Sequence, residues 1–436
     1  MDDSKNWHKL IDDLFDWYHG NRLWKDPRPF LDNELYDAPY EAAAYAIKKF
    51  LYATHTYAAD YNDLIDYLPD EYLPEIAEAV IVAAEMEAPE DRVTDAIGQI
   101  IDQQNTALYP YLDRLFELIT HHDRDFGYRV QGAWRGASNI DGLKAIISDK
   151  QLPNEIKAKA CECLLETRHP EVIKHAIKQI EAGQVDMPSN LESTLLWLGY
   201  EWDGANLHQL YSDTVYHLIF QQRYRSTHTP EYLKHVTPPE HPTYHLDTSR
   251  AKRLIFGGVT ENNCWICQKP LHHIITIEPE LTGLPIHSRQ YVELVTCLSC
   301  PDWETKGLYY HHNESGKAES IPHGEPTRTL DMNSPGFMPT EVALVQSPPR
   351  WQWQGTTRRN SHEVNLTRLG GNPYWLQFDE EYLDCPECGK RMDFLMQLMD
   401  SLPEANGTPQ AWGDTGMGYF FWCDACAISG FVSVTY

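Results

Sequence analysis

The sequence predicts an α+β protein with an all-α N-terminal domain (residues 1–200) and a β-rich C-terminal domain (residues 201–436). Three observations lead to this prediction. Apolar residues recur at helical spacing in the first part, β-type runs fill the second part, and four Cys-x-x-Cys pairs lie beyond residue 263. Because 436 residues exceed what one hydrophobic core usually organises, we expect two domains.

Apolar stripes with a helical period mark the N-terminal domain. The first runs from Trp7 to Tyr18 behind Ser4, which is a candidate N-cap. Two further stripes begin at Val93 and Leu108, and within each of them apolar residues recur every three or four positions. These stripes are typical of helices that bury one face.

Residues 157–180 resemble a HEAT-type repeat, with Pro170 near the start of the second helix. The resemblance implies short antiparallel helices that stack into a solenoid, and an irregular helical bundle is the alternative. Cys161 and Cys163 belong to this segment. Because they are two residues apart on a helix, we expect Cys163 in the core, Cys161 outside it, and neither of them on a metal.

β-type runs appear after residue 200, where proline, glycine and aromatic residues also become frequent. Runs of apolar and β-branched residues predict strands there. The predicted strands are residues 215–220, 272–277, 291–297, 393–399, 418–423 and 430–436.

The Cys-x-x-Cys pairs belong to a unit that occurs twice. A Gly-Gly dipeptide, a first cysteine pair, a β-type run and a second pair follow one another in each copy. With the cysteines aligned, Lys269 corresponds to Lys390, and apolar residues of the following runs also correspond. We therefore expect two similar modules, with one site formed by Cys264, Cys267, Cys297 and Cys300 and the other by Cys385, Cys388, Cys423 and Cys426.

Four thiolates form the complete tetrahedral shell of a structural zinc ion, so we expect two Zn²⁺ ions with a structural role. Iron in a rubredoxin-like site and redox-active dithiols are the alternatives. We expect Gly389 to adopt the positive φ that such a cysteine turn requires. His272 and His273 follow the first pair, and we interpret them as strand residues rather than ligands.

The charge is strongly negative and concentrated. The chain carries 36 basic and 64 acidic residues, a net charge of −28. This argues against binding to nucleic acids or to anionic membranes and permits a basic protein partner, while solubility is the commoner reason for such a net charge. The candidate partner-binding acids are Asp63, Asp66, Asp70, Glu71, Glu75, Glu78, Glu85, Glu87 and Glu90. A solvated helix face is the competing interpretation of this tract.

Motifs of catalysis and export are not found. The sequence shows no phosphate-binding glycine loop, no zincin helix and no nucleophile elbow, and we therefore expect a protein that is not an enzyme. The N-terminal residues are acidic and polar, and the longest uniformly apolar stretch, residues 79–84, is far shorter than a membrane span. We expect a cytoplasmic protein.

The C-terminal half resembles the YwqG-like bacterial family, a domain of unknown function. The resemblance rests on Gly370, Gly371, Pro373 and Trp375, and on the strand that contains Met392 and Gln397. Eukaryotic programmed-cell-death-type chaperones of a ribosomal protein have a similar layout. YwqG-like proteins are often found beside polymorphic toxins, and the resemblance implies an immunity role.

The leading hypothesis is a cytoplasmic immunity protein that binds a cognate, basic, nuclease-type toxin and occludes it stoichiometrically. The alternative is a zinc-dependent chaperone or adaptor for a basic client such as a ribosomal protein. An enzyme whose site is assembled from separate strands is a third class.

Overall fold

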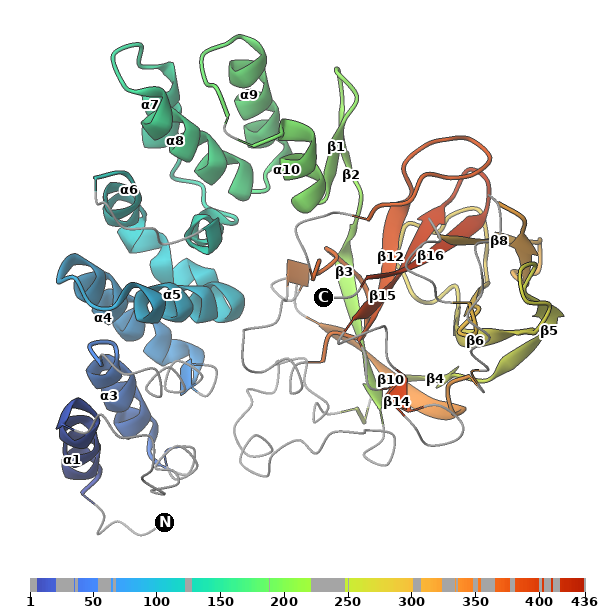
Figure 1. Cartoon of the computed structure of the whole chain (residues 1–436), viewed down its shortest axis with the longest axis horizontal. Coiled ribbons are helices and arrows are strands. Elements are labelled where there is room, and N and C mark those ends of the chain that lie inside the picture. Colours follow the sequence, from blue (N-terminus) through green and yellow to red (C-terminus); the bar gives the residue numbers. More distant parts are fainter. Residues whose placement is uncertain are drawn as a thin grey trace. The chain divides into compact units, whose positions relative to one another are not determined.

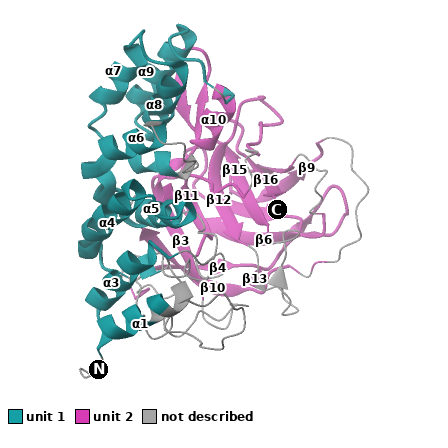
Figure 2. Ribbon diagram, turned by 60° about the vertical axis from the view of Figure 1, so that its left-hand side comes forward, with its two compact units in different colours: residues 1–190, 230–238 teal, residues 191–229, 239–436 magenta. Residues whose placement is uncertain are grey.

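The computed structural model describes residues 6–20, 35, 38–53, 64–65, 68–121, 128–187, 189–220, 248–249, 251–300, 307–323, 334, 336–347, 352–353, 365–376, 381–399, 402–403, 409–410 and 416–434. The chain forms two compact units. Unit 1 contains residues 1–190 and 230–238, and unit 2 contains residues 191–229 and 239–436 (Figure 2). The sequence places its domain boundary at residue 200. The protein is α+β, with helices in unit 1 and a large antiparallel sheet in unit 2 (Figure 1).

Unit 1 is built from helices that pack on their neighbours in the chain. For example, α1 packs on α3, α4 on α5, and α8 on both α7 and α9. Its elements are α1 (Trp7–Gly20), α3 (Tyr40–Phe50), η2 (Asp70–Tyr72), α4 (Leu73–Glu85), α5 (Glu90–Gln104), η3 (Asn105–Tyr111), α6 (Leu112–His121), η4 (Tyr128–Trp134), α7 (Asp141–Ser148), α8 (Asn154–Glu166) and α9 (Pro170–Glu181).

The predicted helical stripes become the buried faces of these helices. In α5, Val93, Ile97 and Ile100 are fully buried. Each such side chain contributes roughly 1.5–3 kcal/mol when it leaves water. The prolines act at helix starts as expected, since Pro153 precedes α8 and Pro170 is the first residue of α9.

The prediction for Cys161 is wrong. Cys161 and Cys163 are both fully buried, although they lie on different faces of α8. The reason is that α8 packs against α6, α7, α9 and η4 and is therefore covered on more than one side. Burial raises the pKa of the Cys161 thiol to about 12, so this thiol stays protonated and unreactive.

Unit 2 begins with a helix and continues as strands. Its elements are α10 (Leu191–Trp197), β1 (Tyr200–Trp202), β2 (Leu207–Gln209), β3 (Ser212–Phe220), β4 (Lys252–Phe256), β5 (Val259–Asn263), β6 (Pro270–Ile277), β7 (Val292–Thr296), β8 (Leu308–His312), β9 (Ala318–Ile321), β10 (Thr340–Ser347), β11 (Arg368–Gly371), β12 (Asp393–Met399), β13 (Leu402–Pro403), β14 (Pro409–Gln410), β15 (Met417–Cys423) and β16 (Ile428–Val434).

One large sheet holds most of these strands. Its order is β5-β6-β4-β10-β3-β11-β12-β15-β16-β8-β9, and β7 pairs with β6. All six predicted strands are present, as β3, β6, β7, β12, β15 and β16. The two end strands approach each other, because Asn262 Nδ2 on β5 donates a hydrogen bond to Ala318 O on β9 at 2.7 Å.

The sheet consists of two modules with matching strands. Module 1 contains β3, β4, β6, β7 and β8, and module 2 contains β10, β11, β12, β15 and β16. The modules exchange strands, since β10 pairs with β4 of module 1 and β3 pairs with β11 of module 2. Two further contacts, β3 with β10 and β8 with β16, join the modules directly. Neither module can therefore complete its sheet without the other.

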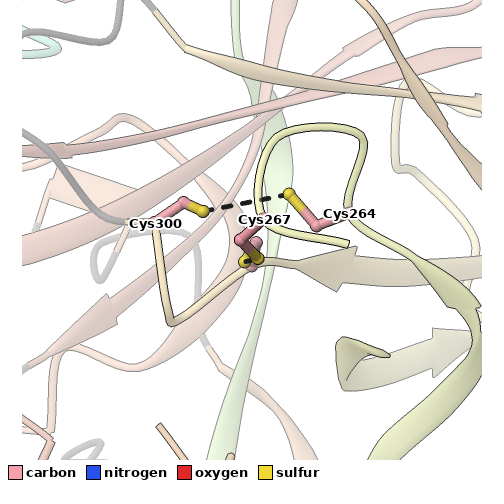
Figure 3. Close-up of side chains that lie close together, drawn as sticks. Cys264, Cys267 and Cys300 are labelled. Atoms are coloured by element: carbon pink, nitrogen blue, oxygen red, sulfur yellow. Dashed lines mark hydrogen bonds between the residues drawn. The ribbon is translucent and has the colours of Figure 1, made fainter. Parts of the chain in front are cut away.

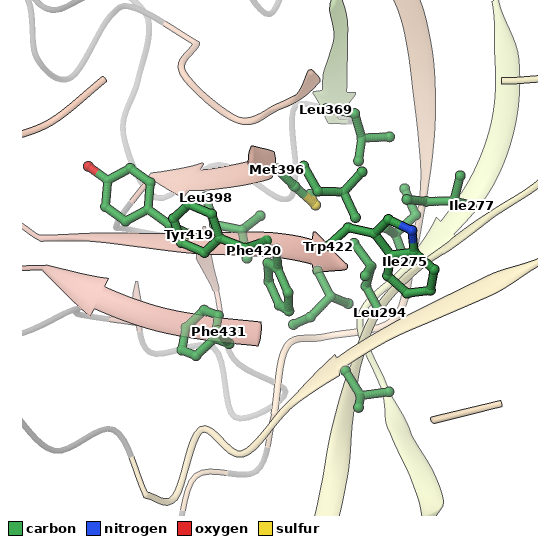
Figure 4. Close-up of a cluster of buried hydrophobic side chains, with 14 of the residues drawn as sticks. Ile275, Ile277, Leu294, Leu369, Met396, Leu398, Tyr419, Phe420, Trp422 and Phe431 are labelled. Atoms are coloured by element: carbon green, nitrogen blue, oxygen red, sulfur yellow. The ribbon is translucent and has the colours of Figure 1, made fainter. Parts of the chain in front are cut away.

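Both modules share one hydrophobic core. Ile275, Leu294 and Ile277 of module 1 lie in the same cluster as Met396 and Trp422 of module 2 (Figure 4). Aromatic rings pack on one another in this core, and the ring centroids of Phe420 and Phe431 lie 4.8 Å apart.

Among the described residues, no helix has the length and apolar character needed to cross a membrane.

Candidate metal centres and acidic surface

The eight paired cysteines gather into two clusters, each with four sulfur atoms. Within each cluster the four Sγ atoms lie within 4.8 Å of one another. In centre 1 the cysteines precede β6 and follow β7, and in centre 2 they precede β12 and lie at or just after the end of β15. Because β6 pairs antiparallel with β7 and β12 with β15, each set of four cysteines lies at one end of its strand pair. Figure 3 shows Cys264 and Cys300 of centre 1 with their sulfurs turned toward each other. The members are Cys264, Cys267, Cys297 and Cys300 in centre 1, and Cys385, Cys388, Cys423 and Cys426 in centre 2.

The first cysteine pair of each centre sits in the same backbone turn. Cys264 N donates to Lys269 O at 2.8 Å, and Cys385 N donates to Lys390 O at 2.8 Å. The fourth residue after the first cysteine has positive φ in both turns, 60° at Gln268 and 68° at Gly389. This conformation closes the turn and directs two sulfurs toward one point.

The strand that follows each turn is irregular at the same place. The pairing of β6 with β7 shifts between His273 and Ile275, and that of β12 with β15 shifts between Phe394 and Met396. A β-bulge bends its strand and increases its twist, and here it occurs at corresponding positions of the two modules. The sequence repeat thus corresponds to a repeated backbone geometry.

The spacing of the sulfurs fits a tetrahedral ion. Zn–S bonds of about 2.3 Å imply S–S separations of about 3.8 Å. The observed separations are 4.0 Å for Cys264 and Cys300, 3.5 Å for Cys267 and Cys297, and 3.7 Å for Cys388 and Cys423. All are far longer than a disulfide bond of about 2.05 Å.

Electrostatics within centre 1 also favour a cation. Hydrogen bonding with Cys297 and then with Cys300 lowers the pKa of Cys264, while hydrogen bonding with Cys264 raises the pKa of Cys297. Close sulfurs thus share protons, because a second negative charge beside the first is costly. A divalent cation removes this penalty and allows all four thiols to ionise.

The second cysteine pair of centre 1 is held by His272. Leu298 N, between Cys297 and Cys300, donates to His272 Nδ1 at 2.9 Å, and the other ring nitrogen contacts Ser334 O at 3.2 Å. His272 is therefore a strand residue of β6 that holds the backbone between two candidate metal ligands. The sequence predicts the strand position, but the contact depends on strand pairing and is not visible in it.

Asp393 occupies the corresponding position in module 2. It pairs with Trp422 as His272 pairs with Thr296. Burial, followed by the nearby charge of Asp424, raises the pKa of Asp393 to about 6. Asp424 itself lies between Cys423 and Cys426 and accepts hydrogen bonds from His287 N at 2.7 Å and Ser288 N at 2.8 Å. It thereby ties a loop of module 1 to centre 2, a role that the sequence analysis missed.

The candidate partner-binding acids that the structure describes lie along η2, α4 and the start of α5. Asp63 and Asp66 lie outside the described residues. Asp70 and Glu90 are half-buried, whereas the other five are exposed: Glu71, Glu75, Glu78, Glu85 and Glu87. Glu75, Glu78 and Glu85 share one face of α4 because they are spaced by three and seven residues.

Basic residues neutralise two of these acids. Glu75 pairs with Lys48, and Glu85 accepts two hydrogen bonds from Arg114, at 2.7 and 2.5 Å. The bond to Arg114 lowers the pKa of Glu85. Within the described part of the chain, Glu71, Glu78 and Glu87 have no ion pair. The uncompensated negative surface is therefore smaller than the acid count of the sequence implies.

An exposed apolar side chain accompanies these acids. Met86 follows α4 directly and is 67% exposed. Glu87 beside it has a φ of 59°, and its N–H and that of Ala88 bond back to carbonyls of the last turn of α4. The helix end therefore presents a flexible thioether and a carboxylate together.

No protein-family model matches the chain, and no solved structure matches it either. An uncharacterized protein, YpfL of Salmonella typhimurium (strain LT2), is 26% identical over 183 residues. The similarity covers 39% of this chain and 39% of YpfL, so the chain spans well under half the length of this curated relative. The name of YpfL assigns no activity to it.

Proposed function

We propose that the chain is an immunity-type binding protein that occludes a basic toxin, and that two structural Zn²⁺ ions stabilise its β-rich unit. The observation that supports the metal part is the pair of four-sulfur clusters with tetrahedral spacing. Four thiolates leave no open position for water or substrate, which favours a structural role. The ions would draw together strand ends that are distant in sequence and stabilise the shared core.

The proposed binding surface consists of three exposed acids that have no ion pair among the described residues, here called the acidic patch, and of the exposed Met86. Glu71, Glu78 and Glu87 would steer a cationic partner, and Met86 would provide an apolar contact. Stacking of consecutive helices in unit 1, of the HEAT type, would display the acidic patch on an extended surface. The proposed class of partner, a toxin that acts in the cytoplasm, comes from the resemblance to YwqG-like proteins. The protein itself would then also be found in the cytoplasm.

Metal analysis tests the first part of the proposal. Purified protein is expected to hold two Zn²⁺ per chain, and strong chelators are expected to unfold unit 2, because a structural zinc contributes about 10–16 kcal/mol. Elemental analysis and near-ultraviolet circular dichroism measure both effects. Fewer than two bound ions, or iron in their place, would contradict the assignment.

Binding kinetics test the second part. The protein is co-expressed with the product of the adjacent toxin gene, and the complex is measured at low and high salt. Glu71→Lys, Glu78→Lys and Glu87→Lys together are expected to reduce the association rate at least tenfold at low salt, because rim charges act on encounter.

A matched control uses exposed acids from the other end of unit 1, namely Asp141→Lys, Asp149→Lys and Glu155→Lys. It changes the net charge by the same amount and is expected to alter the rate less than twofold. An equal effect of the two triple variants would show that only the net charge of the protein matters and that the acidic patch is not the binding surface. Absence of any complex with the toxin, together with capture of a ribosomal protein, would favour the chaperone alternative.

A further inference from the structure

The two centres differ in how well the protein shields their sulfurs. In centre 1, Cys264, Cys297 and Cys300 are buried and Cys267 is half-buried. In centre 2, Cys388 is exposed and Cys426 is half-buried, while Cys385 and Cys423 are buried. The same backbone turn therefore gives one covered and one open cluster.

The surroundings explain this difference. The turn of centre 1 lies against β9, where Trp265 N donates to Ser320 Oγ at 3.3 Å. In addition, Cys297 N donates to the hydroxyl of the buried Tyr310 at 3.1 Å. The turn of centre 2 projects outward, since Glu387, Cys388, Gly389 and Lys390 are all exposed. A Cβ placed on Gly389 would meet no atom within 4 Å.

We propose that Cys388 is an oxidation site and that hydroperoxides release the metal of centre 2 while centre 1 keeps its own. This inference depends on the metal assignment proposed above. Thiolate character and exposure together decide which cysteines react with peroxides. Metal ligands are thiolates in both centres, so exposure is the property that separates Cys388 from the rest.

The reaction requires a second sulfur, and Cys423 provides it. Cys388 attacks one oxygen of the hydroperoxide, the O–O bond breaks, and a sulfenic acid forms as hydroxide or alkoxide leaves. The Cys423 thiolate, 3.7 Å from Cys388, then attacks the sulfenic sulfur, and hydroxide leaves as the disulfide forms. Two sulfurs have lost two electrons, and the peroxide oxygens have gained them.

The disulfide removes two of the four ligands from centre 2. The remaining pair, Cys385 and Cys426, is too small a set to hold Zn²⁺ in a structural site. Cys423 is also the last residue of β15, which pairs with β12 and β16. Oxidation would therefore act on the strands that carry module 2 and leave the turn of centre 1 in place.

The test follows zinc release and cysteine modification in the zinc-loaded full chain. Zinc content is measured first, so that a chain without two ions refutes the metal assignment before any oxidant is added. Hydrogen peroxide is then added with a chromogenic zinc indicator. One equivalent is expected to be released at least tenfold faster than the second, with peptide mapping showing a Cys388–Cys423 disulfide and unmodified cysteines in centre 1.

Two ligand-preserving variants sharpen the test. Cys388→His keeps four ligands but removes the exposed thiolate, and it is expected to slow the fast release at least tenfold. Cys267→His changes the corresponding ligand of centre 1 and is expected to leave the fast release unchanged. Release of both ions at one rate, or oxidation beginning in centre 1, would overturn the proposal. Because the peptide map uses the unaltered chain, it decides the question even if a variant fails to fold.

Discussion

Modules 1 and 2 have the same backbone plan but different surroundings. The turn hydrogen bonds, the positive φ and the bulge correspond residue by residue. The strand that precedes the first cysteine pair is also paired in the same way in both modules: Phe256 pairs with Ile275 in module 1, and Leu369 pairs with Met396 in module 2. What differs is the cover over the sulfurs and the residue beneath the second cysteine pair. A duplicated motif thus specifies local geometry, while the neighbouring segments decide how far its cysteines are exposed.

The largest expected contrast between the modules comes from removing one ligand in each centre. Cys297→Ser removes a fully buried ligand that is surrounded by the shared core, and it is expected to abolish folding of unit 2. Cys426→Ser removes a half-buried ligand and is expected to leave a folded protein with one tightly bound zinc. Zinc content and thermal unfolding measure the difference. Equal losses in the two variants would show that exposure does not separate the centres.

A smaller effect is expected at the position where His272 and Asp393 correspond. Because the folded-state pKa of Asp393 is raised to about 6 from 3.8, folding favours its protonated form, and stability falls as pH rises through this interval. Asp393→Asn removes that loss. At pH 7 it is expected to stabilise the protein by about 1–2 kcal/mol, with allowance for partial solvent exposure.

The pH dependence provides the control for this prediction. The stability difference between Asp393→Asn and the unaltered protein is expected to grow from about pH 4 to about pH 6 and then to stay constant. Chemical denaturation at several pH values measures it. A difference that is independent of pH, or a destabilising substitution, would show that ionisation of Asp393 has no cost in the folded state.

The smallest effect concerns the turn residue with positive φ. Gly389→Ala is expected to cost about 1 kcal/mol through backbone strain alone, because the added methyl group has open space around it. Gln268→Gly relieves the same strain in module 1 but loses the hydrogen bond from Gln268 Nε2 to Trp265 O. It is expected to change stability by less than about 0.5 kcal/mol. Denaturant midpoints compare the two substitutions, and a larger change at Gln268 would contradict this view of the turn.

Local patterns predicted the parts of the structure that depend on short-range geometry. Helical stripes such as Val93 to Ile101 became buried helix faces, and the apolar runs became β3, β6, β7, β12, β15 and β16. Strands with mixed composition were missed, among them β5, where exposed and half-buried residues alternate, and the glycine-rich β11. Their strand character comes from pairing with neighbours rather than from their own residues.

The sequence by itself determined the two sets of four cysteines and the α+β division, because ligand spacing and apolar period are local properties of the chain. Only the tertiary structure decided that Cys161 is buried and that basic residues neutralise Glu75 and Glu85. It also decided that the two modules exchange strands, and that Cys388 is exposed while its counterpart Cys267 is half-buried. The physical reason is that exposure and charge compensation depend on which distant segments pack beside a residue, and no local pattern of the chain encodes that.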